Sequence, residues 1–336
     1  MHLSLLKWEN VRKLRLTYFY ALLLAFLKQN SYEGLMTHAS TDRNEIPLRM
    51  LFCGLTDRWQ QVNDVLIIAS SHRSDETYPL NNFNRVIPFD MNIALDTMLG
   101  HGNSSRLPPG AFLHYQDAMM IVHRVVKHMG WEKIVYMGHS LGCLVGYSYC
   151  STFNDFVTQF IAIDALKPLV FKPEDAVQIN RKNIEKFLSF EKMGTPHAYT
   201  YDEAIDKFLS GFIYKHHLSR ESVKVLLRRG LVKSEEDDTK FHFSRDPRGK
   251  IGHIDLGTSN RNLIKYAENM RCEVLKIQAK NSVVYEPPEL SSAAFENLKK
   301  HCPKVELVEV EGTHYVHLNT PENIVHIIND FIHGTI

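Results

Sequence analysis

The residue best placed to do chemistry is a serine set between two glycines. The segment Gly138–Gly142 reads GHSLG, so Ser140 has a glycine two positions before it and another two positions after it. An apolar run, 133–137, precedes this segment, and a helix-compatible stretch, 143–150, follows it. A strand, a sharp turn that carries serine and then a helix form the context of a nucleophile elbow, in which glycine relieves backbone clashes. The pattern therefore predicts Ser140 as a nucleophile.

A serine hydroxyl needs a base, because it is a weak nucleophile at neutral pH. The base is usually a histidine that a carboxylate orients, and in this context the expected chain order is serine, acid, histidine. His314 lies two residues after Gly312, which ends the last predicted strand, so we prefer it to His317. The competing interpretation is that either histidine only packs against the closing helix.

Two carboxylates compete for the role of the acid. Glu286 lies in the loop after the penultimate predicted strand and is the first choice on loop position. Asp164 ends the strand before that one and is the alternative, since some hydrolases place the acid there. An aspartate at a strand end often only caps the following turn, which ranks Asp164 second.

Backbone amides are expected to stabilise the oxyanion that forms when serine attacks a carbonyl. The amide of Leu141, the residue after the nucleophile, supplies one donor. The second donor should come from a loop after an early strand, and the segment Cys53-Gly54-Leu55 offers the Leu55 amide.

Composition excludes several other classes of function. The chain has 336 residues, 23% charged residues and a net charge of +1, which gives no electrostatic case for nucleic acid. Its five cysteines are scattered without a Cys-x-x-Cys pair, and no His-Glu-x-x-His appears, so neither a metal nor any other cofactor is expected. Neither Gly-x-Gly-x-x-Gly nor a Walker pattern supports nucleotide binding. Reduced thiols favour a cytoplasmic protein.

The amino-terminal segment, residues 1–45, carries little pattern beyond one short apolar helix candidate. Leu16–Leu27 is an unbroken apolar run that follows basic residues and is too short to span a bilayer comfortably. It resembles the core of a signal peptide, but no small-x-small cleavage site follows it. A weak membrane association and a buried helix are both left open, and a membrane-associated or signal-directed location stands beside the cytoplasmic one.

The rest of the chain alternates strands and helices, which predicts an α/β fold with a mostly parallel sheet covered on both faces. Strands are expected within 47–53, 60–79, 92–96, 133–137, 156–164, 272–279 and 305–310, and helices at 113–131 and 321–331. Residues 165–271 read as mostly helical, with an acidic run at 234–238. We predict a core of residues 46–164 and 272–336, and a helical cap of residues 165–271 at the sheet edge where such folds bind ligands.

Four segments carry a resemblance to a known family. They are GHGNSSRLPPG (100–110), MGHSLG (137–142), FSRDPR (243–248) and EGTHYVHL (311–318). With them the chain resembles the α/β-hydrolase family and, within it, the serine hydrolase-like (kraken-like) group. The resemblance implies an α/β-hydrolase fold, a nucleophile at Ser140, a base at His314 and a helical cap inserted before the last two strands. Serine, where related enzymes use aspartate, points to acyl transfer from an ester.

Two hypotheses for function follow. The first is a metal-independent, carboxylesterase-like serine hydrolase that acts on a small-molecule ester. The second is a catalytically impaired α/β-hydrolase-fold binding protein, because the early His-Gly-x-x-Asp of the family appears here as Cys53-Gly54-x-x-Asp57.

Overall fold

Ser140, Asp164 and His314 follow the carboxyl ends of strands in one parallel sheet. The computed structural model describes residues 50–52, 65–69, 93–95, 110–111, 114–170, 173–194, 196–211, 218–250, 258–283, 286 and 288–336. Within these residues the sheet has seven strands in the order β3-β1-β2-β4-β5-β8-β9, and each pair is parallel. The strands are β1 (Met50–Phe52), β2 (Val65–Ala69), β3 (Ile93–Leu95), β4 (Ile134–His139), β5 (Val157–Ile163), β8 (Glu273–Ala279) and β9 (Val305–Val310). The predicted α/β-hydrolase architecture is confirmed.

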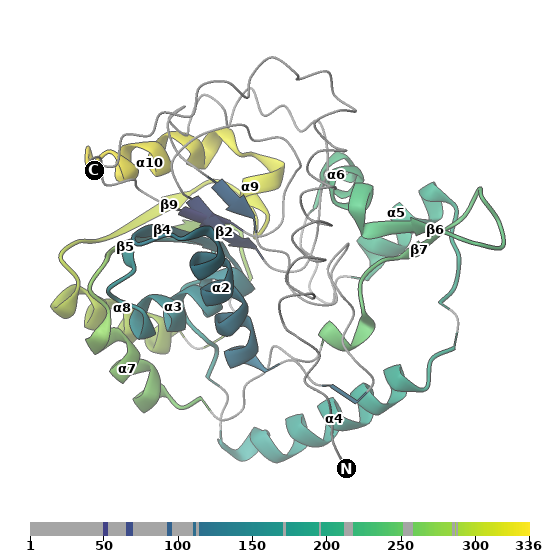
Figure 1. Cartoon of the computed structure of the whole chain (residues 1–336), viewed down its shortest axis with the longest axis horizontal. Coiled ribbons are helices and arrows are strands. Elements are labelled where there is room, and N and C mark those ends of the chain that lie inside the picture. The colour runs from purple at the N-terminus through teal and green to yellow at the C-terminus, as the bar shows by residue number, and fades with distance from the viewer. Residues whose placement is uncertain are drawn as a thin grey trace, which may run out of the picture. The chain divides into compact units, whose positions relative to one another are not determined.

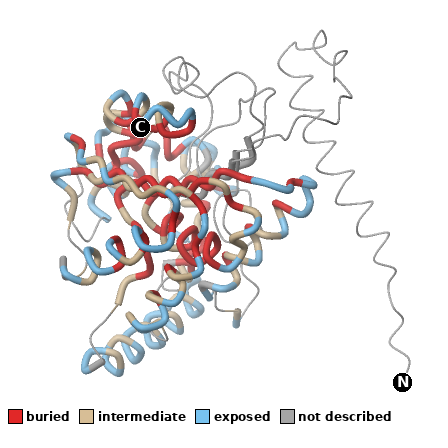
Figure 2. The backbone as a smooth tube through the Cα atoms, turned by 90° about the vertical axis from the view of Figure 1, so that its left-hand side faces the viewer, coloured by how far each residue is buried: buried red, intermediate tan, exposed pale blue. Residues whose placement is uncertain are grey.

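Helices cover both faces of this sheet (Figure 1). Side chains of a strand alternate between the faces, and β4 shows it, since Tyr136 belongs to one apolar cluster and Met137 to the other. The first cluster joins the sheet to α2 (Tyr115–Met129), α3 (Leu141–Thr152), α7 (Asn260–Asn269) and α8 (Pro288–His301). The second joins it to α9 (Val316–Asn319) and α10 (Glu322–Ile332). Figure 2 shows the buried strands running between these layers.

The helix predicted at 113–131 is α2, and its ends follow from the local sequence. Asp117 accepts a hydrogen bond from the His114 amide at 2.8 Å, which satisfies a donor at the start of the helix. Gly130 ends the helix in the left-handed conformation, with φ of 69°. Val122 and Val126 are buried one turn apart, so the same face of α2 packs on the sheet.

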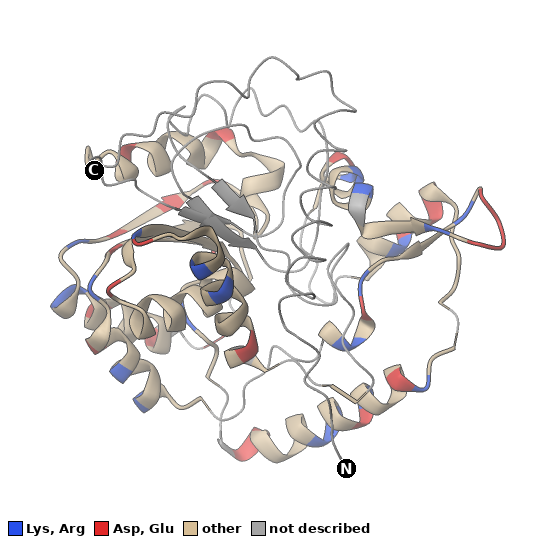
Figure 3. Cartoon of the chain, in the orientation of Figure 1, with Lys and Arg blue, Asp and Glu red and all other residues tan. Residues whose placement is uncertain are grey.

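A helical segment lies between β5 and β8, the interval of the predicted cap. It contains α4 (Pro173–Glu191), α5 (Tyr201–Ser210), α6 (Arg220–Gly230), the hairpin of β6 (Leu231–Lys233) and β7 (Phe241–Phe243), and the 3-10 helix η1 (Pro247–Lys250). The acidic run at 234–238 lies in the hairpin loop (Figure 3). The last helix of the interval, α7, packs on α3 and α8 and so covers the sheet.

A third apolar cluster joins this segment to the loop that follows β9. It contains Ile205 of α5, Leu226 and Leu227 of α6, and Tyr315 and Leu318 beyond β9. The segment is therefore fixed by buried side chains directly against the residues that follow His314.

Two sequence predictions fall outside the described residues. They concern the apolar run Leu16–Leu27 and the amide of Leu55. Among the residues that the structure describes, no helix has the length and apolar character needed to cross a membrane.

Candidate active site

The nucleophile elbow forms where β4 meets α3. Ser140 adopts φ of 52° and ψ of −115°, a conformation that non-glycine residues rarely take and that strained functional turns retain. A Cβ on Gly138 would lie 2.5 Å from the backbone carbon of Gly142, so this turn excludes any larger residue at position 138. Ser140 keeps partial solvent exposure although every residue of β4 is buried.

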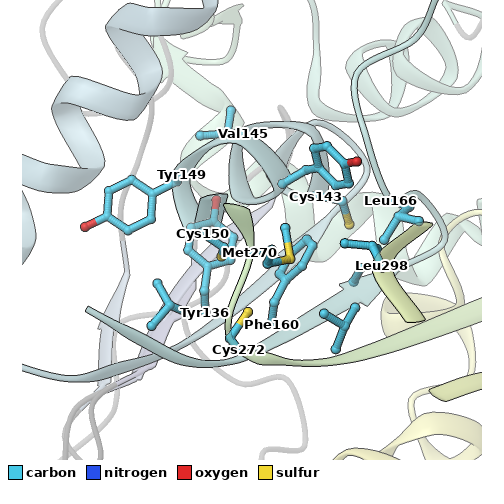
Figure 4. Close-up of a cluster of buried hydrophobic side chains, with 14 of the residues drawn as sticks. Tyr136, Cys143, Val145, Tyr149, Cys150, Phe160, Leu166, Met270, Cys272 and Leu298 are labelled. Atoms are coloured by element: carbon cyan, nitrogen blue, oxygen red, sulfur yellow. The ribbon is translucent and has the colours of Figure 1, made fainter. Parts of the chain in front are cut away.

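Two buried side chains stabilise the elbow through hydrogen bonds to its backbone carbonyls. The Tyr136 hydroxyl donates to the Gly142 carbonyl at 2.9 Å, and the Cys143 thiol donates to the Gly138 carbonyl at 2.9 Å. Tyr136 of β4 and Cys143 of α3 both belong to the apolar cluster drawn in Figure 4. A Cβ on Gly146 would lie 2.3 Å from the Tyr136 ring, so this glycine lets α3 approach the sheet closely. Burial raises the pKa of Cys143, which keeps its thiol neutral and unreactive.

The Leu141 amide, the first predicted oxyanion donor, lies at the start of α3. Leu141 begins α3, where the first N–H groups have no acceptor within the helix. Within the described ranges its N–H donates to no acceptor, whereas the Cys143 and Leu144 amides both donate to the Ser140 carbonyl. The positive end of the helix dipole adds to the attraction for negative charge at this amide.

His314 and Asp164 form a buried pair beside the elbow. His314 Nδ1 lies 2.6 Å from Asp164 Oδ2, and the side chains are 5% and 0% exposed. A carboxylate only accepts, so Nδ1 carries the proton and Nε2 has a lone pair that can take a proton from serine. Gly312, with φ of 147°, begins the turn that leads to His314. A Cβ added to Gly312 would lie 2.9 Å from the Val316 side chain.

The Asp164 carboxylate is held by further donors from β8 and the loop after it. Its Oδ1 accepts hydrogen bonds from Gln278 Nε2 at 2.8 Å and from the Ala279 amide at 2.9 Å. Its Oδ2 accepts a hydrogen bond from the Ser282 hydroxyl as well as from His314. These donors compensate for the loss of water around the carboxylate and fix its orientation.

The structure places the two predicted acids in different surroundings. Glu286 binds Lys167, whose Nζ lies 2.7 Å from both carboxylate oxygens, and the side chains are 11% and 1% exposed. Loop position favoured Glu286. However, the Glu286 carboxylate forms an ion pair with Lys167, a buried lysine three residues after Asp164. Asp164, the second choice, is the carboxylate that accepts the hydrogen bond from His314.

Two further histidines surround the base, and no motif predicted their arrangement. His139 Nε2 donates to the His314 carbonyl at 2.7 Å, so the residue before the nucleophile also holds the loop of the base. The His317 ring lies 4.0 Å from that of His139. Burial lowers the pKa of His317 to about 3, and its proximity to the His314 imidazole acts in the same direction. His317 is therefore neutral at ordinary pH, and it does not contact Asp164 among the described residues.

The residues described contain no group of three or more histidine, cysteine or carboxylate side chains suited to a metal ion. The chemistry that this arrangement can perform uses the side chains of Ser140, His314 and Asp164 with a backbone oxyanion donor.

Comparison with known proteins places this geometry in a family. A family model described as alpha/beta hydrolase fold matches residues 93–230. A probable serine hydrolase from Drosophila melanogaster is 30% identical over 78% of this chain and 79% of its own length. Serine hydrolase-like protein 2 from Homo sapiens is 27% identical over 76% of this chain and 83% of its own length.

Solved structures agree on the fold. The hypothetical protein PA1622 from Pseudomonas aeruginosa superposes with a TM-score of 0.63 at 18% identity, covering 87% of this chain and 93% of that one. E-2-(Acetamidomethylene)succinate hydrolase gives a TM-score of 0.59 at 14% identity, covering 85% and 92%. The chain therefore belongs to the serine hydrolase-like group of the α/β-hydrolase family.

Proposed function

We propose that this protein is a serine hydrolase that cleaves carboxylic esters through Ser140, His314 and Asp164. The observation that carries the proposal is the buried 2.6 Å contact between His314 Nδ1 and Asp164 Oδ2 beside a strained serine elbow. The contact fixes the imidazole tautomer that can act as a base. Membership of a family whose relatives bear the name serine hydrolase supports the same class of reaction.

The proposed reaction proceeds through an acyl-enzyme. Ser140 Oγ attacks the ester carbonyl carbon while His314 Nε2 takes the serine proton, and Asp164 stabilises the imidazolium that forms. The carbonyl oxygen becomes an oxyanion that the Leu141 amide binds, with the Leu55 amide as the proposed second donor. His314 then gives its proton to the leaving alkoxide as the carbon–oxygen bond breaks. Water, activated by the same histidine, releases the carboxylic acid and restores Ser140.

We further propose that α4, α5, α6 and the β6–β7 hairpin act as a cap over this site. The apolar cluster that joins α5 and α6 to Tyr315 and Leu318 supports this role, because it anchors the segment next to the base. A cap excludes water from the acyl-enzyme and shapes the pocket for the substrate.

Steady-state hydrolysis of p-nitrophenyl esters of increasing chain length tests the reaction. We expect turnover by the wild-type protein, and a loss of about 10⁴-fold or more in kcat in Ser140→Ala and in His314→Ala. Ser292→Ala, which alters an exposed serine of α8 outside the proposed cap, serves as the matched control and should retain the wild-type rate. Equal rates in Ser140→Ala and the wild type would contradict the assignment. A wild-type protein without turnover on any ester would favour the impaired binding protein instead.

A further inference from the structure

Arg245 is a half-buried cation that lacks a carboxylate partner. It lies between β7 and η1, within the FSRDPR segment. Its Nε is shielded from solvent and has no hydrogen-bond partner, and Nη2 reaches only the Gly249 carbonyl, at 3.4 Å. That distance exceeds the usual range for such bonds. Among the described residues no aspartate or glutamate forms an ion pair with Arg245.

The neighbouring carboxylate is committed to a different arginine. Asp246 binds Arg248, with Oδ2 at 2.8 Å from Nη2 and Oδ1 at 3.1 Å from Nε. The Asp246 side chain is 5% exposed and that of Arg248 is 12% exposed. The bidentate geometry gives both charged groups a strong partner. One segment thus holds two arginines, of which Arg248 is neutralised and Arg245 is not.

Arg245 lies close to the loop that carries the proposed base. Phe243, two residues earlier, packs against the apolar cluster that contains Tyr315. An electrostatic interaction with Tyr315 opposes the effect of burial on the pKa of Arg245, so the two side chains lie near each other. The Tyr315 ring centroid lies 5.2 Å from that of His314, to which it is joined in sequence. Tyr315 therefore lies near both the guanidinium and the base.

A guanidinium in this position has a cost that an anion would offset. Burial lowers the pKa of Arg245 to about 10, which still leaves it charged at neutral pH. A buried charge without a partner is destabilising, and a bound anion would offset that cost. The planar fork of arginine matches the two oxygens of a carboxylate or a phosphate.

We propose that Arg245 binds an anionic group of the substrate, a carboxylate or a phosphate that is separate from the ester to be cleaved. This inference rests on the proposed ester hydrolysis at Ser140. It assigns the protein to esters whose acyl or alcohol part carries a negative charge. Because the residue acts on a part of the substrate that does not react, its loss should affect anionic esters far more than neutral ones.

A matched pair of esters tests the selectivity. Mono-p-nitrophenyl adipate carries a terminal carboxylate, and p-nitrophenyl hexanoate has the same acyl length without it. We expect Arg245→Gln to lower kcat/KM for the adipate ester by about 10–100-fold, the range for one lost charge-assisted interaction, and to change the hexanoate value less than about threefold. Arg245→Lys should recover part of the lost activity. Arg261→Gln, which alters an exposed arginine of α7 outside the proposed cap, is the control and should leave both values unchanged.

Equal losses for the two esters would overturn the proposal, because they would assign Arg245 a structural role. So would an unchanged preference in a folded Arg245→Gln protein with a normal unfolding temperature.

A binding measurement separates this inference from the proposed hydrolysis. We expect monomethyl adipate or hexyl phosphate to raise the unfolding temperature of Ser140→Ala, and methyl hexanoate to have a smaller effect. The rise should vanish in the double variant Ser140→Ala, Arg245→Gln. The comparison of adipate with phosphate identifies which anion the site prefers. A charge-selective rise without any ester turnover would support the anion site while refuting the hydrolase proposal. No charge-selective rise would refute the anion site alone.

Discussion

Replacing Glu286 by glutamine should destabilise the protein and leave its catalysis intact. Replacing Asp164 by asparagine should instead remove most of the catalysis. The two carboxylates were the candidates for the acid, and they lie in different surroundings. Asp164 Oδ2 is 2.6 Å from His314 Nδ1, and Glu286 is engaged on both oxygens by Lys167. This pair of variants therefore tests both that Asp164 is the acid and that Glu286 is not.

The magnitudes follow from burial and from the role of each contact. Lys167 is 1% exposed, so Glu286→Gln leaves its ammonium group buried without a counter-charge, which costs about 3–5 kcal/mol of unfolding free energy. Its effect on kcat should stay below about threefold, since Glu286 does not hold His314. Asp164→Asn removes the acceptor that fixes the imidazole tautomer, and the expected loss in kcat is about 10⁴-fold.

Urea unfolding and steady-state ester hydrolysis, both on purified variants, provide the assay. The double variant Lys167→Met, Glu286→Gln is the control, because removal of both charges should recover most of the stability that Glu286→Gln loses. A folded Glu286→Gln protein that has lost turnover, together with an active Asp164→Asn protein, would refute the reasoning.

Three further predictions concern residues around the elbow and the base. Gly138→Ala should lower both the unfolding temperature and kcat, by more than about tenfold for kcat, because its Cβ would lie 2.5 Å from the Gly142 backbone; a normal thermal melt with full activity would contradict the close approach. Ser282→Ala should reduce kcat about tenfold with little change in KM, because it removes one donor to Asp164; an effect confined to KM would argue against a positioning role. The pKa of His317 in the folded protein, about 3, lies below its ordinary value of 6.5. Below pH 6.5 the unfolded chain therefore binds a proton at His317 that the folded protein does not bind, so the free energy of unfolding falls as the pH falls. Between pH 6.5 and 5 the wild type should therefore lose about 2 kcal/mol more than His317→Gln, as measured by urea unfolding at each pH, and parallel losses would contradict the burial of a neutral imidazole.

The sequence was sufficient to predict the sheet and to nominate Ser140 and His314 as site candidates, because each depends on local pattern. Apolar runs indicated the strands, and Gly138 with Ser140 described a turn whose geometry needs those residues. The acid could not be ranked in the same way. Its identity depends on which carboxylate meets Lys167, a contact between residues 119 positions apart.

Other features of the site were beyond sequence reasoning for the same reason. The bond from His139 to the His314 carbonyl joins residues 175 positions apart. The FSRDPR segment was recognised as a family-like motif, yet only the structure shows that Asp246 pairs with Arg248 and leaves Arg245 without a carboxylate. Long-range pairing of polar groups is decided by packing, which no local pattern reports.

The most direct test of the central claim is covalent labelling of Ser140. A fluorophosphonate reacts with a serine only where a base activates the hydroxyl and an oxyanion site receives the phosphoryl oxygen. Intact-mass analysis of the native protein should show a single adduct, absent from Ser140→Ala and from heat-denatured wild type. An adduct of equal yield in Ser140→Ala, or none on the native protein, would contradict the account.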